Sequence, residues 1–371
     1  EAALIVPGVV SILSAEDVEN DSLRAMPPFI TSNPNTTHPF NFIPQPLLAK
    51  KFVRYVGEPI LLVLAKSMYA ALDAVQLIEV DYDVLPFVLS AQEALREDSP
   101  LVAEALGTNL CLNWHCSSNE NIDVIFSKAK HVIELNINNN RIVSNPMEPR
   151  GAIALWDQDT NKYTIYASSQ NIHVMRATVA SMLNVDHTSV RFKAFDVGGG
   201  FGSKNFCYPE YALIGWASKK INKPVRWTAT RSELFISDHQ ARDHYSVSRL
   251  AIADDGKFIA LEINSVANLG AYMVGSSGGV QVVQYANLPG TVYKIPSICL
   301  NISAAFTNKT PTGVFRGPGY AETNLILERL IDAAALKYNL DRLELRKKNF
   351  INKGDMPFTD VLGGSIDSGD F

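Results

Sequence analysis

Residues 198–204 combine four glycines, one aromatic ring and one lysine, and they carry the strongest chemical signal in this sequence. The β-rich residues 190–197 precede them, and a segment with helical character follows. Glycines at a strand-to-helix turn tolerate positive φ angles and let backbone N–H groups approach a ligand closely. An anionic group is the natural ligand for such a turn. Phe201 indicates that a further part of the ligand packs beside the anion.

This loop departs from two common phosphate-binding motifs. The dinucleotide fingerprint G-x-G-x-x-G requires a glycine at Ser203 and an acidic residue about twenty residues later, where residues 221–224 read Ile-Asn-Lys-Pro. The P-loop motif requires Ser or Thr after its lysine, whereas Ser203 precedes Lys204. A tight turn that only starts a helix is the plain structural alternative.

Three further turns carry polar residues beside predicted strands. Residues 147–150 read Met-Glu-Pro-Arg, residues 168–171 read Ser-Ser-Gln-Asn, and residues 312–319 read Thr-Gly-Val-Phe-Arg-Gly-Pro-Gly. Strand ends are where α/β folds place ligands. The planar guanidinium of Arg316 suits an oxyanion or a phosphate, although a surface arginine is the simpler interpretation. For Glu148, a structural ion pair is the favoured interpretation.

The composition is that of an ordinary globular protein, with 371 residues, 47% hydrophobic and 19% charged. This length allows a sizeable core and two or three domains. The formal net charge of -5 argues against a nucleic-acid partner. No apolar run approaches the roughly 20 residues of a membrane span, and no signal peptide is visible. We therefore expect a cytoplasmic protein.

The cysteine and histidine patterns speak against a metal bound by side chains. The four cysteines form no C-x-x-C pair, and the spacing of Cys111 and Cys116 alone holds neither zinc nor an iron–sulfur cluster. Reduced thiols are expected. The seven histidines form no H-E-x-x-H or H-x-H motif, and G-x-S-x-G is absent, which disfavours serine hydrolysis. If the protein performs redox chemistry, its electrons must leave through another chain.

Hydrophobic periodicity predicts the elements that position these turns. In the N-terminal part we expect a strand at 9–13, a buried strand at 52–65, a helix at 68–77 capped by Ser67, and a strand at 78–84. If the last two strands are parallel, the crossover between them is right-handed.

The remainder is predicted to be mixed as well. Expected strands are 132–138, 151–156, 162–167, 190–197, 245–253 and 257–267. Asp255 and Gly256 indicate a hairpin between the last two. Helices are expected at 209–219, which starts with Pro209, and at 322–338, which has one apolar stripe.

In this order, the turns resemble those of the molybdenum-containing large subunit of the xanthine oxidase family, in the branch of carbon monoxide dehydrogenase and aldehyde oxidoreductase large chains. Phe-Val-Arg-Tyr-Val-Gly-Glu-Pro at 52–59 and Ile-Glu-Val-Asp-Tyr at 78–82 resemble the hammerhead domain of that family. Five motifs resemble its first molybdopterin-binding domain; they lie at 147–150, 169–171, 198–202, 313–319 and 345–349. Five motifs in the family's order are far more specific than any one of them.

The resemblance implies an α+β fold. A partial hammerhead α/β domain is expected at residues 1–93, and one molybdopterin-binding domain of mixed sheets and helices at residues 94–371. The opening strands of the hammerhead and the family's second molybdopterin-binding domain are expected outside this sequence. As an isolated chain the protein is therefore expected to be incomplete, either truncated or split.

The cofactors and partners follow from the same resemblance. Molybdopterin, expected in its cytosine dinucleotide form, carries a molybdenum ion that hydroxylates a carbon centre with oxygen from water. Electrons then pass to [2Fe-2S] clusters and FAD, which are expected only on partner subunits. The expected partners are an iron–sulfur subunit, an FAD subunit, a chain with the second molybdopterin domain, and a small-molecule substrate.

Matching the motifs residue by residue implies seven cofactor-binding positions: Gln170, Gly200, Phe201, Gly202, Phe315, Arg316 and Gly317. The Gln170 side chain and the N–H of Gly202 are expected to reach oxygen ligands of molybdenum. Arg316 is expected to offer its backbone N–H near the metal. No side chain is expected to ligate the metal, and no catalytic residue is expected here, because the family's glutamate base belongs to the second domain.

Two departures from the family patterns bear on the substrate. Asn205 stands where purine-oxidising members carry a glutamate, and residues 313–319 lack the copper-binding cysteine of true carbon monoxide dehydrogenases. We therefore expect oxidation of an aldehyde, or of an N-heterocycle. Two other hypotheses remain open: a non-catalytic scaffold that retains the fold, and a dehydrogenase whose glycine loop accepts NAD.

Overall fold

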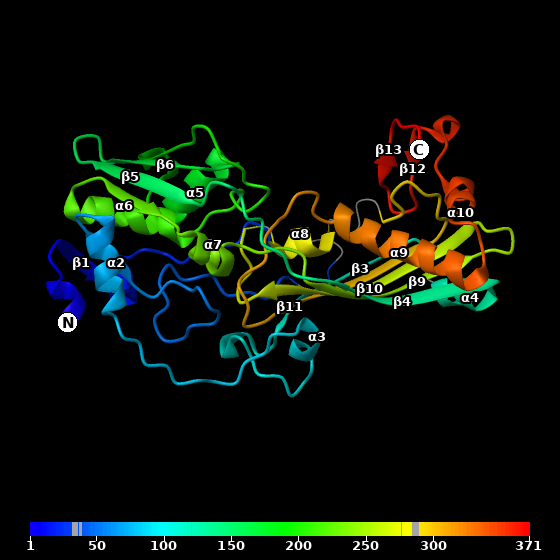
Figure 1. Ribbon diagram of the computed structural model, residues 1–371, viewed down its shortest axis with the longest axis horizontal. Coiled ribbons are helices and arrows are strands. Elements are labelled where there is room, and N and C mark those ends of the chain that lie inside the picture. Colours follow the sequence, from blue (N-terminus) through cyan, green and yellow to red (C-terminus); the bar gives the residue numbers. More distant parts are fainter. Residues whose placement is uncertain (32–35, 37–38, 120, 276, 284–288) are drawn as a thin grey trace.

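Two mixed β-sheets form the centre of the protein, and helices pack against both (Figure 1). The computed structural model describes residues 1–31, 36, 39–119, 121–275, 277–283 and 289–371. A smaller N-terminal unit lies beside the first sheet, and the C-terminal residues extend beyond the second (Figure 1). The predicted α+β class is confirmed.

The first sheet has four strands in the order β7-β6-β5-β8. Their bounds are β5 Gly151–Asp157, β6 Lys162–Ala167, β7 Val190–Lys193 and β8 Val225–Thr228. Strands β6 and β7 are parallel, whereas β5 is antiparallel to both of its neighbours. The helices of this region are α5 Ile172–Met182, η3 His187–Ser189, α6 Pro209–Ile221 and α7 Arg231–Ser237. Because β6 and β7 run in the same direction, the turns that follow them leave the same edge of the sheet.

The second sheet has five strands in the order β3-β11-β10-β9-β4. Their bounds are β3 Leu110–Ser117, β4 His131–Asn139, β9 His244–Ile252, β10 Phe258–Gly270 and β11 Ile298–Phe306. The hairpin predicted at Asp255 and Gly256 joins β9 to β10, and Gly256 has the positive φ of 85° that the turn requires. Elements around this sheet are α4 Ile122–Lys128, α8 Ser277–Val283, α9 Tyr320–Tyr338, α10 Arg342–Asn349, η5 Lys353–Asp355, β12 Phe358–Thr359 and β13 Ser365–Ile366.

Helix α9 covers β4 and β9 through its predicted apolar stripe. Leu327, Leu330, Ile331 and Ala334 are fully buried. Burial of each larger side chain contributes roughly 1.5–3 kcal/mol. The helix begins directly after the turn at 313–319, so this packing fixes where that turn ends.

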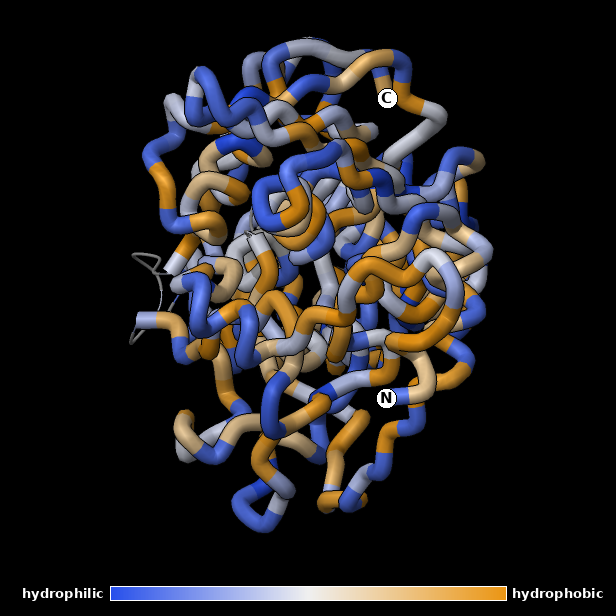
Figure 2. Tube along the Cα trace, turned by 90° about the vertical axis from the view of Figure 1, so that its left-hand side faces the viewer, coloured by the Kyte–Doolittle hydropathy of each residue, from blue (hydrophilic) through white to orange (hydrophobic). Residues whose placement is uncertain are grey.

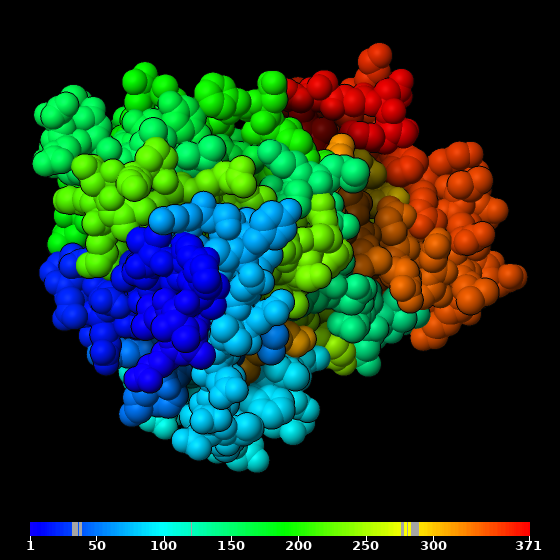
Figure 3. Space-filling view, turned by 60° about the vertical axis from the view of Figure 1, so that its left-hand side comes forward, coloured from blue at the N-terminus to red at the C-terminus, as the bar shows by residue number. Residues whose placement is uncertain are grey.

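The N-terminal unit contains η1 Ala2–Ile5, β1 Val9–Leu13, α1 Ala15–Asn20, β2 Leu62–Ala65 and α2 Met68–Gln76, followed by α3 Ala91–Ala94 and η2 Glu104–Leu106. As predicted, Ser67 caps α2, accepting a hydrogen bond from the N–H of Ala70 at 3.2 Å. Trp216 of α6 donates through Nε1 to Asp21 at 2.7 Å, which fixes α1 against the first sheet's helix. Figure 3 shows this unit (blue) packed below the green residues of the first sheet.

Two predictions for the N-terminal unit are wrong. The strand expected at 52–65 is confined to β2, because Gly57, with φ of 103°, and Pro59 turn the chain before it. Residues 78–84 are not a strand, so no parallel crossover exists, and β1 pairs with β2 antiparallel. The alternation at 78–84 suits a strand, but a strand requires a pairing partner, and the described residues provide none. Likewise, the strand expected at 190–197 ends at Lys193, before the glycine loop.

The extended segment after α2 leaves apolar side chains in solvent. Val80, Tyr82, Val84 and Phe87 are all exposed, Val84 to 85%. Figure 2 shows hydrophobic stretches in orange at the lower edge of the molecule, where this segment runs in Figure 1. Across the described residues, no helix is both long and apolar enough to cross a bilayer.

Candidate cofactor-binding site

The turn after β6 and the glycine loop after β7 are joined by hydrogen bonds. The N–H of Gly202 donates to Oε1 of Gln170 at 2.9 Å, and the N–H of Gln170 donates to the carbonyl of Lys204 at 2.9 Å. A Cβ atom at Gly200 would lie 2.4 Å from the same Oε1. The two turns therefore form one surface, and Gly200 is required by the close approach of Gln170.

The turn at 313–319 completes this surface. The N–H of Arg316 donates to the carbonyl of Phe201 at 3.0 Å. A Cβ at Gly202 would lie 2.2 Å from the carbonyl oxygen of Val314, and Gly202 has a φ of 111°. Only glycine fits at this position. Turns separated by more than 100 residues along the chain thus meet at Gly202.

All seven predicted cofactor-binding residues lie at this meeting point. Gln170, Gly200, Phe201, Gly202 and Arg316 contact one another directly, as described above. Phe315 and Gly317 flank Arg316 in the same turn. Gly317 has a φ of 69°, and a Cβ there would meet nothing within 4 Å, so open space lies beside the turn.

The hydrogen bonds bear on the roles predicted for these residues. The amide oxygen of Gln170 and the N–H of Gly202, both expected to contact oxygen ligands of a metal, bind each other in this structure. Because Gln170 accepts through Oε1, its NH₂ group is the part of the amide that can donate to an anionic ligand. The Arg316 N–H is directed at Phe201. The proposed contacts to the metal's ligands stay predictions.

Phe201 is held in an unusual backbone conformation. Its φ is 53°, in the left-handed region that a bulky residue rarely adopts, and its side chain is 41% exposed. Such a conformation costs about 1–3 kcal/mol and is found preferentially at functional sites. The ring lies against Gly199, whose Cβ would be 3.1 Å from Phe201 Cε2.

Lys204 anchors the glycine loop from inside the protein. Its side chain is fully buried, and Nζ donates to both the carbonyl and Oε2 of Glu148 at 2.8 Å. Glu148 also accepts from the N–H of Gly198 and from Oγ of Ser168, each at 2.7 Å. Burial disfavours the Glu148 carboxylate, but these hydrogen bonds together hold its pKa below the usual value. The ion pair favoured for Glu148 thus joins the turns at 147–150 and 198–204.

Arg150 forms a second, deeper anchor. Its side chain is fully buried, with Nε 2.6 Å from Oδ1 of Asp238 and one terminal nitrogen 3.0 Å from Oε1 of Glu210. The guanidinium lies 3.5 Å from the ring centroid of Tyr208. Tyr208 in turn donates its hydroxyl hydrogen to the carbonyl of Ser203 at 2.7 Å. The charge of Arg150 is therefore balanced locally and supports the glycine loop through Tyr208.

Residues 238–243 contact the surrounding turns, and the sequence motifs did not single them out. The N–H of His239 donates to the hydroxyl of Tyr208 at 3.1 Å. The carbonyl of Gln240 accepts from the N–H of Gly313 at 2.6 Å. The sequence shows only two adjacent opposite charges here, because Arg150, Arg316 and Glu322, which bind the side chains of Asp238 and Arg242, lie 74 to 88 residues away along the chain.

His239 lies within this framework as a neutral ring. It stacks on Tyr208 with 4.0 Å between ring centroids and is 3% exposed. Neither ring nitrogen has a hydrogen-bond partner among the described residues. Burial, followed by the positive charge of Arg150, lowers the pKa of His239 to about 3. The ring therefore stays uncharged at neutral pH and serves packing rather than proton transfer.

The donor set fits an organic cofactor better than a bare metal ion. Within the described residues, no group of three or more His, Cys, Asp and Glu side chains is arranged to hold a metal. The meeting point instead offers backbone amides, a glutamine amide and an aromatic ring around glycine positions that exclude side chains. These groups can hold a cofactor that carries its own metal ligands.

Two family models match this chain. The model of the molybdopterin cofactor-binding domain matches residues 102–350, and that of the aldehyde oxidase and xanthine dehydrogenase a/b hammerhead domain matches residues 1–86. The chain belongs to the molybdopterin-binding large subunits of the xanthine oxidase family. The predicted order of the two domains is thereby confirmed, and the exact boundary at residues 93 and 94 stays a prediction.

Individual relatives cover the whole chain. It is 31% identical to the carbon monoxide dehydrogenase large chain of Hydrogenophaga pseudoflava, over 100% of this chain and 47% of that protein. Quinoline 2-oxidoreductase from Pseudomonas putida 86 superposes with a TM-score of 0.91 and 31% identity, over 99% of this chain and 46% of that one. Aldehyde oxidoreductase from Desulfovibrio gigas superposes with a TM-score of 0.87 and 26% identity, over 98% of this chain and 38% of that one. The chain spans about half the length of the curated relatives it matches.

Proposed function

We propose that this chain forms the hammerhead and the first molybdopterin-binding domain of a molybdenum hydroxylase large subunit. The hydroxylase would oxidise an aldehyde or an N-heterocycle with oxygen from water. The observation that supports this proposal is the convergence of the three turns at Gly202, with Gln170 on one side and Phe201 bonded to Arg316 on the other. Their residues match the family motifs position by position.

Within that function, this chain binds and orients the cofactor. When bound, the molybdenum cofactor supplies the two-electron oxidation of a carbon centre and the transfer of oxygen from water. The NH₂ group of Gln170 would donate a hydrogen bond to the cofactor, and the ring of Phe201 would exclude water from one side of it. The ion pair between the buried Lys204 and the partly exposed Glu148 keeps the loop in one conformation, so little reorganisation accompanies binding.

The partners are proposed from the names of the relatives. One relative, 32% identical over 85% of this chain, is subunit gamma of the 6-hydroxypseudooxynicotine dehydrogenase complex, and others are large chains or large subunits. We propose an iron–sulfur subunit and an FAD subunit as electron acceptors. The second molybdopterin domain would cover the exposed side of Gln170 and Arg316 and supply the glutamate base. We also propose the cytosine dinucleotide form of the pterin.

For the substrate, we propose only a chemical class. Asn205 cannot supply the acid found in purine-oxidising members, which argues against xanthine. Similarity to named N-heterocycle enzymes, quinoline 2-oxidoreductase at 31% and nicotine 6-hydroxylase at 30%, exceeds the 26% to the Desulfovibrio gigas aldehyde oxidoreductase. This observation supports the N-heterocycle as a full second candidate beside the aldehyde.

The test is metal and pterin analysis of the protein purified with all its partner subunits. We expect molybdenum and pterin to co-purify with the chain. Reduction of an artificial electron acceptor should then depend on an aldehyde or an N-heterocycle, and not on xanthine or carbon monoxide. Molybdenum bound without turnover of any substrate would favour the scaffold hypothesis. Absence of molybdenum from every preparation would refute the proposal, and saturable binding of NAD would favour a dehydrogenase instead.

A further inference from the structure

Arg242 holds the turn at 313–319 from within the protein. One terminal nitrogen of its guanidinium donates to the carbonyl of Arg316 at 3.1 Å, and the group lies 5.4 Å from the centroid of the Phe315 ring. The side chain of Arg242 is only 8% exposed. It therefore contacts two of the seven predicted cofactor-binding residues while remaining out of solvent.

The same guanidinium is fixed by a buried carboxylate. Its other terminal nitrogen lies 2.5 Å from Oε1 of Glu322, whose side chain is 3% exposed. Glu322 belongs to the first turn of α9, where the helix dipole favours a negative charge. Arg242 thus ties Arg316 inside the turn to the helix that follows it. A single planar guanidinium thus binds both the carbonyl of Arg316, within the turn, and the carboxylate of Glu322, at the start of the helix.

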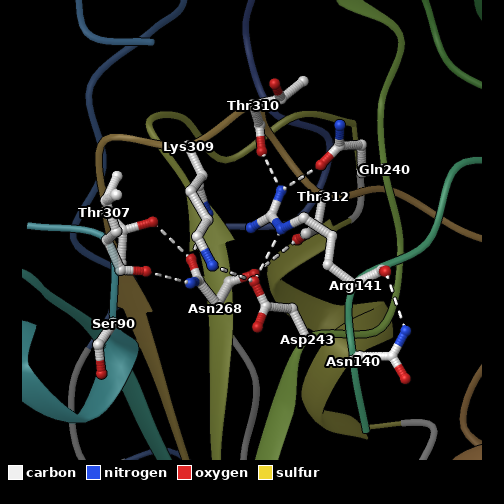
Figure 4. A network of polar contacts seen from close by, with 12 residues as sticks. Ser90, Asn140, Arg141, Gln240, Asp243, Asn268, Thr307, Lys309, Thr310 and Thr312 are labelled. Carbon is white, nitrogen blue, oxygen red and sulfur yellow. Dashed lines mark hydrogen bonds and ion pairs between the residues drawn. The ribbon is translucent and has the colours of Figure 1, made fainter. Parts of the chain in front are cut away.

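The backbone beneath Arg242 is itself strained. Arg242 and Asp243 are consecutive non-glycine residues with φ of 65° and 70°. Such conformations persist only where neighbouring contacts hold them. The carboxylate of Asp243 supplies these contacts, with Nε of Arg141 at 2.7 Å and Nζ of Lys309 at 3.3 Å. In Figure 4, Arg141 also reaches Gln240, to which it donates at 3.1 Å.

These two adjacent residues therefore face different structures. Asp243 forms ion pairs with Arg141, just after β4, and with Lys309, after β11. Arg242 instead binds the turn at 313–319 and α9. A rotation at either residue would displace the carbonyl of Arg316. Since the peptide N–H of Arg316 bonds to Phe201, such a displacement would also reach the glycine loop.

We propose that Arg242 is a positioning residue for the cofactor site, which sets the backbone of residues 315–317 through its contacts with Arg316 and Glu322. This role requires no contact between Arg242 and the cofactor. The statement about the turn stands on the contacts alone, whereas its consequence for the cofactor rests on the proposed function.

The experiment compares R242M with R249M in the purified protein, with its partner subunits. Arg249 is the control: it lies within strand β9, which begins two residues after Arg242, pairs with Glu262 at 2.5 Å and lies 4.3 Å from the Phe126 ring, away from the three turns. Amide hydrogen exchange is measured by mass spectrometry on peptides that cover residues 313–319. Molybdenum per chain is measured on the same samples.

For R242M we expect exchange in residues 313–319 to rise by roughly tenfold, because the turn opens locally more often. Molybdenum per chain should fall with it. R249M should leave exchange in this peptide within about twofold of the natural protein. R242K keeps the charge beside Glu322 but lacks the planar fork, so its exchange should also rise, and it replaces R242M if that variant does not fold.

Exchange in R242M and R242K that matches the natural protein would overturn the proposal, as would an equal rise in R249M. The two proposals fail separately. If the natural protein contains no molybdenum, the proposed function is lost, and the exchange of residues 313–319 still decides whether Arg242 positions the turn.

Discussion

The amide oxygen of Gln170 and the backbone N–H of Gly202 are hydrogen-bonded at 2.9 Å across two turns that follow parallel strands. From the third turn, the carbonyl of Val314 approaches so closely that a Cβ added at Gly202 would lie 2.2 Å from its oxygen. The site is therefore built from backbone groups and one side-chain amide, and its most sensitive positions are glycines rather than charged side chains.

Substitution of Gly202 by alanine should destabilise the protein by roughly 3 kcal/mol, because the new Cβ meets a backbone oxygen and the backbone keeps a positive φ. Gly317 is a matched control with a φ of 69° and open space around it. G317A should cost about 1 kcal/mol. Urea unfolding of both variants measures the difference. Equal losses would show that φ alone, and not the approach of Val314, requires glycine at position 202.

Truncation of Glu148 should lower the stability of the protein, because it leaves the buried ammonium group of Lys204 without its carboxylate partner. E148A should lower the free energy of unfolding by roughly 2–3 kcal/mol, since Lys204 is fully buried while Glu148 is partly solvated. E148Q retains an oxygen acceptor and should lose less. Thermal unfolding of the two variants at neutral pH provides the comparison, and a larger loss for E148Q would contradict the ion-pair explanation.

The same pair should produce an acid-sensitive stability. Hydrogen bonds from Lys204, Ser168 and Gly198 outweigh burial and hold the pKa of Glu148 below its usual value. A carboxyl group with a lowered pKa contributes stability above about pH 4, which is lost as the pH falls through the folded-state value. The difference in melting temperature between the natural protein and E148Q should therefore shrink as the pH is lowered below about 4. A constant difference would argue against this linkage.

His239 should contribute a second pH dependence with the same sign. Burial keeps its ring neutral, and its pKa is lowered to about 3, whereas the unfolded chain takes up the proton near pH 6.5. Stability is thus lost as the pH falls through this window. H239F removes the titrating group and two unpartnered nitrogens, so its stability should depend less on pH between about 6.5 and 3. Parallel pH profiles for the two proteins would contradict this expectation.

Gly57 should be required for docking of the N-terminal unit. A Cβ at this position would lie 2.7 Å from the carbonyl oxygen of Ile236 in α7, and φ is 103°. G57A should loosen the unit and increase proteolytic cleavage near residues 52–61. Gly107 provides the control, because its φ is 64° and nothing lies within 4 Å of a Cβ there. Comparable cleavage in G57A and G107A would show that the contact with Ile236 is unimportant.

Local signals in the sequence predicted the elements that local chemistry determines. Ser67 begins α2, Pro209 occupies the first turn of α6, and Asp255-Gly256 joins β9 to β10, because capping and turn formation depend on neighbouring residues. The strand expected at 78–84 failed for the opposite reason. Alternation indicates which residues could form a strand, whereas pairing depends on distant residues.

The candidate site divides in the same way. The glycine loop and the turn at 313–319 are visible as motifs, since their backbone geometry demands particular residue types. Residues 238–243 follow no such pattern: Arg242 reaches Glu322 across 80 positions, and Arg150 reaches Asp238 across 88. Only the folded structure brings these charges together. The motifs of the site could therefore be recognised in the sequence, whereas residues 238–243, which hold those motifs in place, could not.

The extended residues 78–84 pair with no strand among the described residues, and this should affect the polypeptide at high concentration. Unpaired backbone flanked by apolar side chains is a template for strand addition between molecules, so preparations of the chain by itself should oligomerise. Glu79, Asp81 and Asp83 alternate with those side chains and repel their counterparts on an approaching copy. Added salt screens that repulsion, and the solubility of the isolated polypeptide should therefore fall as ionic strength rises.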